Sequence, residues 1–489
     1  MCLATTKPVA RVLRSTLSYA PAILLTRVSA LLMLVIATRL ISQEEFGLLT
    51  LVVTVGELTD LALASWLRIS LLRLGGKGEI SRGSVLLAAR VLALTTVLGL
   101  GVAAAASLLV APERWAEFSL AVGAYLIVGA MSRFALVLVQ LQQRHFAYSM
   151  LELGRAVLQL VLPVAAIWLL ADSFLMVSLA SSLAVLASGF AALYLASGRV
   201  IAGPPRFTQR ELLAFGIPLI VMAIVGFGLN SAERVLLKLY YDAGAVAIFA
   251  AAFALARQPI DTVANAINMG AFPEMVSRFD QEGAAAAGRY LSRQMALMAQ
   301  LCLPIAATLA VLGGDFSAVL LPAEYHEHTG KLFPLIALSV LFTNFASFGF
   351  ENVFHAHKKP WLLIVSMTPG AIATIVLSIL LIPHFAELGA ASALAGGSCV
   401  NLLTSMVLSR RLTRIPLPYA ELGQSAAVAL ACGLAAWVGS SALGDMWPLF
   451  KLAAGGGAGI LAFAGLQALL HPDETRAVAQ MLRAKVGIA

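Results

Sequence analysis

Hydrophobic runs without a single charged residue recur along the chain and dominate its pattern. A membrane-spanning helix needs roughly 20 such residues to cross about 30 Å of hydrocarbon. The clearest runs are Val91–Pro112, Ser173–Gly198, Gln294–Gly314, Trp361–Pro383, Leu388–Ser409, Leu422–Gly444 and Leu452–Leu470. They predict membrane helices rather than the core of a soluble domain.

Weaker hydrophobic segments between these runs complete a set of fourteen predicted spans. A hydrophobic content of 60%, a charged content of 12% and a mean hydropathy of +0.91 agree with this set. The fold class is therefore an all-α polytopic membrane protein. The predicted spans are 17–40, 46–67, 83–110, 117–140, 148–171, 173–197, 211–238, 243–270, 291–313, 331–354, 361–383, 387–409, 421–443 and 448–470.

Lys and Arg are distributed unevenly between the connections on the two sides of these spans. With the N-terminus in the cytoplasm, 22 of the 33 fall on the cytoplasmic side, 5 on the outer side and 6 inside spans. Arg68, Arg73, Lys77 and Arg82, for example, follow the second span on the cytoplasmic side. Because positive residues favour cytoplasmic loops, this bias supports fourteen spans with both termini in the cytoplasm. The net charge of +8 therefore follows the topology and does not indicate a nucleic-acid partner.

A weak internal repeat relates the first half of the chain to the second. Pro21 opens the first predicted span and Pro218 the seventh, 197 positions later, and Gly47 and Gly244 match at the same offset. Repeats of this kind are typical of transporters. We therefore expect two pseudo-symmetric six-helix bundles and two further helices. The predicted domains are an N-terminal lobe at 1–200, a C-terminal lobe at 201–415, and two additional spans with a cytoplasmic tail at 416–489.

Twelve charged residues lie inside predicted spans, where an ionised group is costly unless it faces protein or water. All six cations are arginines, which stay charged and offer a planar fork to phosphate or carboxylate. The twelve residues are Arg27, Arg90, Arg133, Arg155, Arg234, Arg257, Glu57, Asp60, Glu152, Glu233, Asp261 and Glu351.

Four of the arginines are predicted to bind an anionic substrate. Arg27 and Arg257 are the candidate head-group ligands, in a cavity lined by spans 1, 2, 7 and 8. Arg133 and Arg90 lie nearer the cytoplasmic side, where they are expected to line the approach to this cavity.

Three carboxylates are predicted to bind a coupling proton or cation. They are Glu57, Asp60 and Asp261. A carboxylate that is desolvated in such a cavity takes up a proton more readily than one in water.

An alternative is that these charges only neutralise one another. Arg257 and Asp261 are four residues apart and can form an ion pair on one helix face. Arg90 and Glu351 lie within about two turns of a span end, so their side chains can reach the membrane interface.

No motif for enzyme chemistry, a metal or an organic cofactor is found in the sequence. There is no Gly-rich phosphate loop that ends in a lysine. The four cysteines have neither a metal-binding spacing nor an obvious pairing. His355 and His357 are interpreted as part of a solvated loop. We therefore expect no cofactor.

Four segments resemble motifs of oligosaccharide repeat-unit flippases, in the same order and spacing. The turn Arg39–Gly47 (RLISQEEFG) resembles their RLLSPEEFG pattern, and Asn230–Arg234 resembles their NxxDR/K segment. Phe272-Pro273 ends the eighth span as theirs often does, and Ile382–Ala391 resembles their IPxxGxxGAA link. The chain departs from the pattern in having Glu233 where aspartate is usual. The resemblance covers most of the chain and is to the Wzx-like branch of the multidrug/oligosaccharidyl-lipid/polysaccharide exporter superfamily.

This resemblance implies a transporter of the bacterial inner membrane and not an enzyme. Such a protein flips undecaprenyl-pyrophosphate-linked oligosaccharide repeat units to the periplasmic leaflet by alternating access. The product is O-antigen, capsule or exopolysaccharide. The expected partners are this lipid-linked oligosaccharide, the lipid bilayer, and a polysaccharide polymerase and chain-length regulator. We expect a monomer.

Two other functions stay open. A cation-coupled multidrug exporter of the same superfamily would share the helix count. A site for organic cations is, however, expected to be acidic or aromatic rather than rich in arginine. A membrane glycosyltransferase or polymerase of the same pathway would also be polytopic, but is expected to carry a large outer loop or catalytic acids outside the bilayer.

Overall fold

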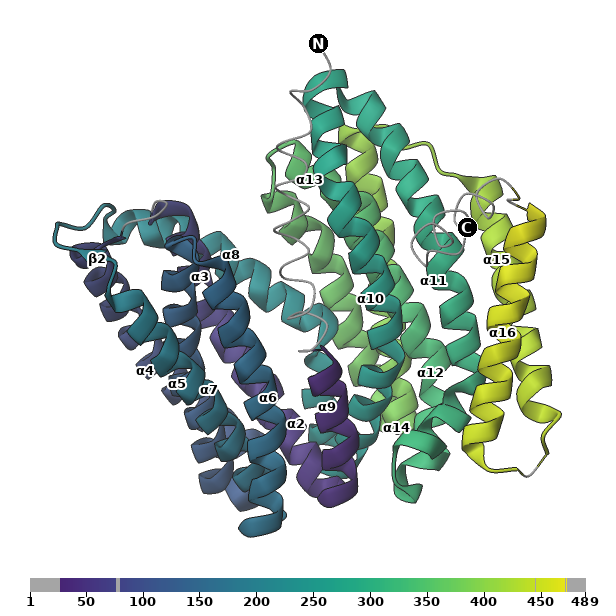
Figure 1. Ribbon diagram of the computed structural model, residues 1–489, viewed down its shortest axis with the longest axis horizontal. Coiled ribbons are helices and arrows are strands. Elements are labelled where there is room, and N and C mark those ends of the chain that lie inside the picture. The colour runs from purple at the N-terminus through teal and green to yellow at the C-terminus, as the bar shows by residue number, and fades with distance from the viewer. Residues whose placement is uncertain (1–26, 76–79, 445, 471, 473–489) are drawn as a thin grey trace, which may run out of the picture. The chain divides into compact units, whose positions relative to one another are not determined.

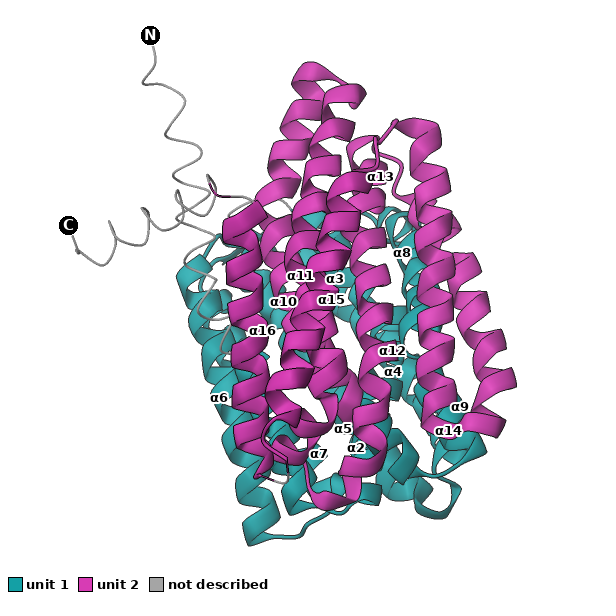
Figure 2. Ribbon diagram, turned by 90° about the vertical axis from the view of Figure 1, so that its right-hand side faces the viewer, with its two compact units in different colours: residues 1–250 teal, residues 251–489 magenta. Residues whose placement is uncertain are grey.

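The computed structural model describes residues 27–75, 80–444, 446–470 and 472, and helices dominate it (Figure 1). The chain divides into two compact units, residues 1–250 and 251–489 (Figure 2). Helix α8 (Gln209–Asn230) packs against α3 (Trp66–Leu74), so it belongs to the first unit. The predicted lobes, with boundaries at residues 200 and 415, stay a prediction.

In its described residues, unit 1 consists of helices and one pair of two-residue parallel strands. Residues 27–40 are helical and precede the first of its labelled helices. The strands join the start of α4 to the connection after α7. Its elements are α2 (Gln43–Asp60), η1 (Leu61–Ser65), α3 (Trp66–Leu74), β1 (Ile80–Ser81), α4 (Arg82–Val110), η2 (Pro112–Arg114), α5 (Trp115–Leu141), α6 (His145–Leu169), α7 (Phe174–Ser197), β2 (Val200–Ile201), α8 (Gln209–Asn230) and α9 (Ala232–Tyr240).

In the described part of unit 2, helices are the only regular secondary structure. Helix α10 begins in unit 1 and runs on into unit 2. The elements are α10 (Ala243–Glu282), α11 (Ala284–Leu320), α12 (Ala323–Asn344), η3 (Phe345–Glu351), α13 (Asn352–Ala356), α14 (Trp361–Leu412), α15 (Tyr419–Ser441) and α16 (Pro448–Leu470). Both η1 and η3 are π-helices.

Within the described part of the chain, twelve helices are long and apolar enough to cross a membrane. The first predicted span, 17–40, lies in part outside the described residues. Spans 361–383 and 387–409 lie in α14, on either side of the non-helical residue Ala386. The predicted all-α polytopic membrane fold is confirmed. The basic residues near both termini, such as Lys7 and Arg483, lie outside the described residues, so the location of the termini stays a prediction.

Helix α14 contains two helices that fold back on each other at Ala386. This residue has φ 47° and ψ −125°, which no helix contains. A Cβ atom on Gly389 would lie 2.5 Å from the carbonyl oxygen of Leu381. A Cβ atom on Gly397 would lie 2.9 Å from the carbonyl oxygen of Gly370. The glycines therefore allow the two halves of α14 to approach closely in an antiparallel hairpin.

Helices α10 and α11 are longer than a membrane crossing requires. They contain 40 and 37 residues, which corresponds to about 60 and 55 Å at about 1.5 Å per residue. The predicted spans 243–270 and 291–313 leave residues 271–290 outside the membrane helices, but helix occupies nearly all of this linker. Only Gly283 interrupts it, with φ +86°, a conformation that glycine adopts easily.

The turn Arg39–Gly47 joins several elements of unit 1. Ser42 caps α2, since its Oγ accepts a hydrogen bond from the backbone N of Glu45 at 3.3 Å. The Glu45 carboxylate pairs with Arg114 and accepts a hydrogen bond from the backbone N of Phe174 at 2.6 Å. These bonds tie the start of α2 to the starts of α5 and α7, which gives the motif a structural role.

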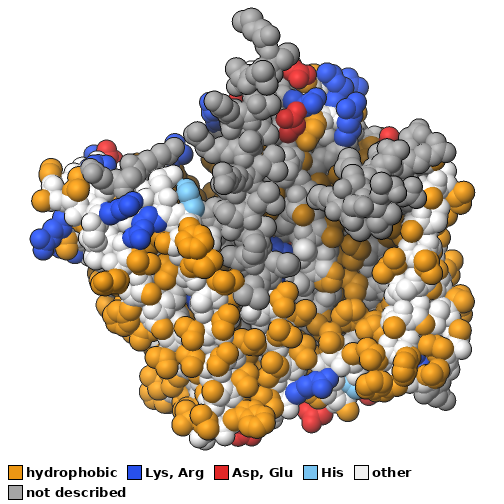
Figure 3. All heavy atoms as spheres, in the orientation of Figure 1, with side chains coloured by type: hydrophobic (Ala, Val, Ile, Leu, Met, Phe, Trp, Pro, Cys, Tyr) orange, Lys and Arg blue, Asp and Glu red, His pale blue; other side chains and the backbone are white. Residues whose placement is uncertain are grey.

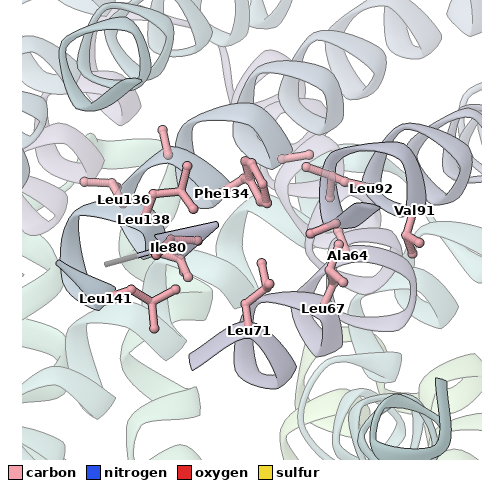
Figure 4. Packing of buried hydrophobic residues seen from close by; sticks show 14 of the residues in the cluster. Ala64, Leu67, Leu71, Ile80, Val91, Leu92, Phe134, Leu136, Leu138 and Leu141 are labelled. Carbon is pink, nitrogen blue, oxygen red and sulfur yellow. The ribbon is translucent and has the colours of Figure 1, made fainter. Parts of the chain in front are cut away.

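Apolar packing in unit 1 centres on α3, α4 and α5. Leu67 and Leu71 of α3 point into a buried cluster that also contains Phe134 of α5 (Figure 4). Beside it, a Cβ atom on Gly216 of α8 would lie 2.1 Å from Trp66. Because helices in lipid associate mainly through close packing, this glycine is part of the α3–α8 contact.

The outer surface has the polarity expected of membrane helices. Hydrophobic side chains cover most of the visible helices, whereas charged side chains gather towards their ends (Figure 3). Leu109 and Trp168, for example, are 72% and 76% exposed. Side chains of this kind on so broad a surface are explained by contact with lipid.

Candidate functional site

A cluster of charged side chains lies inside unit 1 at the end of α2. Asp60 is only 6% exposed. Arg68 donates two hydrogen bonds to it, from Nη1 to Oδ1 at 3.0 Å and from Nη2 to Oδ2 at 2.8 Å. Nη2 of Arg133 lies 2.8 Å from the same Oδ1 as a second ion pair. One buried carboxylate is thus bound by two guanidinium groups.

The π-helix η1 explains why Arg68 meets Asp60. Eight residues separate them, which would place their side chains about 80° apart around an α-helix. η1 lies between them, and a π-turn accommodates about one extra residue. The angular difference falls to about 20°, so both side chains lie on one face.

Two glycines make room for the aromatic and cationic members of this cluster. A Cβ atom on Gly56 would lie 2.5 Å from the ring of Tyr125. A Cβ atom on Gly129 would lie 2.4 Å from Nη2 of Arg133. The guanidinium of Arg133 lies 5.5 Å from the centroid of the Tyr125 ring. Tyr125 is also within electrostatic reach of Glu57.

The unit 1 cluster consists of Glu57, Asp60, Arg68, Tyr125 and Arg133, and its formal charges sum to zero. Hydrogen-bonding capacity is nevertheless left over. Nε of Arg133 has no hydrogen-bond partner among the described residues. This N–H group is itself buried, and a buried donor without an acceptor is unfavourable.

A second charged site lies on α10 in unit 2. Nε of Arg257 donates to Oδ2 of Asp261 at 2.6 Å, and Nδ2 of Asn344 donates to Oδ1 at 2.8 Å. The Phe253 ring lies beneath the Arg257 guanidinium at 5.2 Å. The side chain of Arg257 is 41% exposed. Its two Nη groups make no hydrogen bond to a described residue, so they can still bind an anion in a fork geometry.

The structure places the seven predicted site residues in four ways. Glu57, Asp60 and Arg133 come together in unit 1, whereas Arg257 and Asp261 form a pair in unit 2. Arg27 is partly buried at the first described position, and it has interactions with other groups. Arg90 is exposed on α4, with no ion pair to a described residue.

Sequence reasoning missed three contributors to these sites. Arg68 follows the second predicted span, but it lies in the continuous helical segment Gln43–Leu74. Tyr125 and Asn344 are uncharged and carried no signal without tertiary structure. The interpretation that Glu351 reaches the membrane interface was wrong, because this residue is only 5% exposed and bonds to buried residues of α14.

Comparison with known proteins gives one family and one fold. A family model described as "Polysaccharide biosynthesis protein" matches residues 12–279. The comparison with curated protein sequences gives no match.

Among solved structures, the lipid II flippase MurJ in an inward closed conformation has a TM-score of 0.69 and 11% identity, and the match covers 93% of this chain and 99% of the flippase. An inward-facing multidrug resistance MATE family transporter of the MOP superfamily has a TM-score of 0.57 and 13% identity over 79% and 94%. The Vibrio cholerae MATE transporter VcmN in its bent form has a TM-score of 0.54 and 13% identity over 83% and 98%. At these identities the similarity concerns the fold.

Proposed function

Because the chain belongs to the polysaccharide biosynthesis protein family, we propose that it flips a lipid-linked oligosaccharide across the bacterial inner membrane. The substrate is an undecaprenyl-pyrophosphate-linked repeat unit for O-antigen, capsule or exopolysaccharide, and the movement occurs by alternating access. The likeness of the fold to a lipid II flippase supports transport of a lipid-linked sugar.

The observation that carries this proposal is the incompletely bonded guanidinium of Arg257. A pyrophosphate offers several anionic oxygens, which match the planar fork of arginine. Asp261 and Asn344 hold one side of the group, while its Nη atoms stay available. Arg257 is therefore the leading head-group ligand. Arg133, with its unpaired Nε, is the second, and Arg27 and Arg90 complete the proposed set.

Asp60 and Asp261 orient arginines in this proposal. Protonation of Asp60 would remove the charge from two ion pairs, and protonation of Asp261 would remove it from one. Their predicted role in binding a coupling proton or cation, and that of Glu57, stays a prediction.

The proposal is tested by deleting the gene and measuring two pools, surface polysaccharide and undecaprenyl-linked oligosaccharide in the cytoplasmic leaflet. We expect the first to be lost and the second to accumulate, with rescue by wild type. Normal polysaccharide together with new sensitivity to cationic drugs would instead support a multidrug exporter.

Variants of α10 then test the site. Arg257→Ala is expected not to rescue the deletion, and Arg257→Lys to rescue weakly, because lysine keeps the charge without the fork. Arg278→Ala is a matched control. Arg278 lies on the same helix, pairs with Glu274 four residues away at 2.8 Å, and lies 5.1 Å from the ring of Tyr290. Full rescue by Arg257→Ala would leave the family unchanged and remove Arg257 from the site.

A further inference from the structure

Glu351 is a buried carboxyl group that the proposed substrate site does not use. It is the last residue of the π-helix η3 and is 5% exposed. π-Helical segments are rare and occur frequently at functional sites. η3 packs closely on α11, where a Cβ atom on Gly349 would lie 2.8 Å from the sulfur of Met295.

The groups that bind this carboxyl are all neutral. Oγ of Ser405 donates to Oε1 at 2.9 Å, and Nδ2 of Asn401 donates to the same oxygen at 3.4 Å. Ser347, one turn earlier on η3, is a further neutral side chain close to the carboxyl. No lysine, arginine or histidine among the described residues lies within ion-pair distance of Glu351.

The charged groups on the surrounding elements are engaged elsewhere. On α10, Arg257 and Asp261 form an ion pair with each other. Asp261 also accepts a hydrogen bond from Asn344, the residue directly before η3. On α13, the ring of His355 packs edge-on against Phe272. From α11, Met295 and Gln294 face η3, and both are neutral.

The two charged residues of α14 nearest to this site lie beyond Ser405. They are Arg410 and Arg411, and both are exposed in the last turn of the helix. On α12, Glu324, Glu327 and Lys331 lie in the first turns, more than four turns before Glu351 along the chain.

The amide of Asn401 lies beside Glu351 and can bind either of its protonation states. Oδ1 of Asn401 is buried, in a residue that is 2% exposed, and has no hydrogen-bond partner in the described part of the chain. A buried acceptor without a donor is unfavourable. In its present orientation the amide donates from Nδ2 to an ionised Glu351. Turned over, it presents Oδ1, which accepts a hydrogen bond from a protonated Glu351 in place of the Nδ2 bond. The two amide orientations differ only in the assignment of O and N.

We propose that Glu351, together with Asn401 and Ser405, is a proton-binding site in unit 2. A proton from water adds to a carboxylate oxygen, the new O–H group donates to Oδ1 of Asn401, and Ser405 continues to donate to Oε1. A buried carboxylate without a cation costs several kcal/mol, and protonation removes this penalty. Asp60 and Asp261 differ, because arginines neutralise both. The inference rests on the proposed function in one respect: the proton is taken up and released as transport proceeds.

The first test measures the protonation of Glu351 in the purified full-length protein. A hydrophobic carbodiimide modifies protonated carboxyls in apolar surroundings, and mass spectrometry locates the product. We expect modification of Glu351 near pH 7, a decrease at higher pH, and little at Asp60 or Asp261. Glu351→Gln should abolish the signal and remove a neutral-carboxyl band from the infrared spectrum. An unmodified Glu351 near pH 7 would overturn the proposal.

Ser405→Ala tests the local geometry without altering the carboxyl. Its hydroxyl stabilises the ionised form, so its removal should move the midpoint of the modification to higher pH by about one unit. A shift to lower pH, or none, would contradict the site.

The link to transport is tested in proteoliposomes that carry a substrate gradient directed opposite to proton uptake. The quantity measured is the rate at which the lumen becomes acidic. Wild type is expected to acidify the lumen at least about tenfold faster than Glu351→Gln. Equal rates of acidification would refute the proposal that Glu351 binds the proton that is taken up and released during transport. The two proposals can fail separately. If the deletion strain makes normal surface polysaccharide while Glu351 of the purified protein is still modified in a pH-dependent way, the proposed substrate is refuted and the proton site is not.

Discussion

Replacement of Asp60 by asparagine tests the charged cluster in unit 1 most severely. The side chain keeps its size but loses its charge, so Arg68 and Arg133 are left inside the helical bundle without a counter-ion. In the wild type their side chains are 15% and 31% exposed, against 7% for Asp60. Unfolding should therefore become easier.

The exposures set the magnitude of this effect. Removing one partner of a fully buried ion pair costs about 3–5 kcal/mol, whereas an exposed pair contributes about 0–1 kcal/mol. Because both arginines are partly accessible, we expect Asp60→Asn to lower the free energy of unfolding by about 2–3 kcal/mol. Replacing Arg68 by methionine in the same chain should recover about half of this, because one unpaired cation is removed.

The assay is equilibrium chemical unfolding of the full-length protein in detergent micelles. Glu274→Gln serves as the control, because Glu274 and Arg278 form an ion pair with side chains that are 49% and 37% exposed. The control should lose less than about 1 kcal/mol. If Asp60→Asn loses no more than the control, or if Asp60→Asn and Arg68→Met are simply additive, the two residues do not form the buried pair described above.

Three further predictions concern single positions, each measured by the same unfolding assay. Ala386→Gly should raise the free energy of unfolding by about 1 kcal/mol, because glycine tolerates φ 47°; a loss of stability would refute strain at this turn. Gly216→Ala should lower it by about 1–3 kcal/mol, since the new Cβ atom forces Trp66 to move; no change would refute the close contact. Burial, and then the nearby charge of Lys359, lower the pKa of His357 below its usual 6.5. The stabilisation from neutral His357 is therefore complete above about pH 6.5 and is lost as pH falls through the lowered pKa; His357→Gln should flatten this part of the pH profile, and an unchanged profile would refute it.

Much of the membrane architecture could be predicted from hydrophobic runs, because lipid imposes a length on each helix. The run Trp361–Pro383 and the run Leu388–Ser409 indicated two crossings, and the reversal at Ala386 lies between them. Where lipid imposes no length, the prediction failed. The hydrophobic pattern ends the eighth span at residue 270 and begins the ninth at residue 291, yet α10 extends to Glu282 and α11 begins at Ala284.

The sites were only partly predictable, for geometric reasons. Arg257 and Asp261 are four residues apart in one helix, so their pairing followed from α-helical periodicity. The bond between Asp60 and Arg68 depends on a π-turn, which no regular period describes. The surroundings of Glu351 depend on Asn401 and on residues of the neighbouring helices, far away in the sequence. Such contacts are decided by tertiary packing.

The most direct test of the proposed function is flipping by the purified protein in proteoliposomes. The assay follows a labelled undecaprenyl-pyrophosphate-linked oligosaccharide that faces the lumen. An impermeant glycosidase outside the liposomes cleaves each molecule only after it has been flipped to the outer leaflet. Wild type and Arg278→Ala should empty the lumenal pool at the same rate. Arg257→Ala should be slower by about tenfold or more, because a charged hydrogen bond contributes about 1.5–3 kcal/mol. A wild-type rate equal to that of protein-free liposomes would contradict the proposed flippase activity.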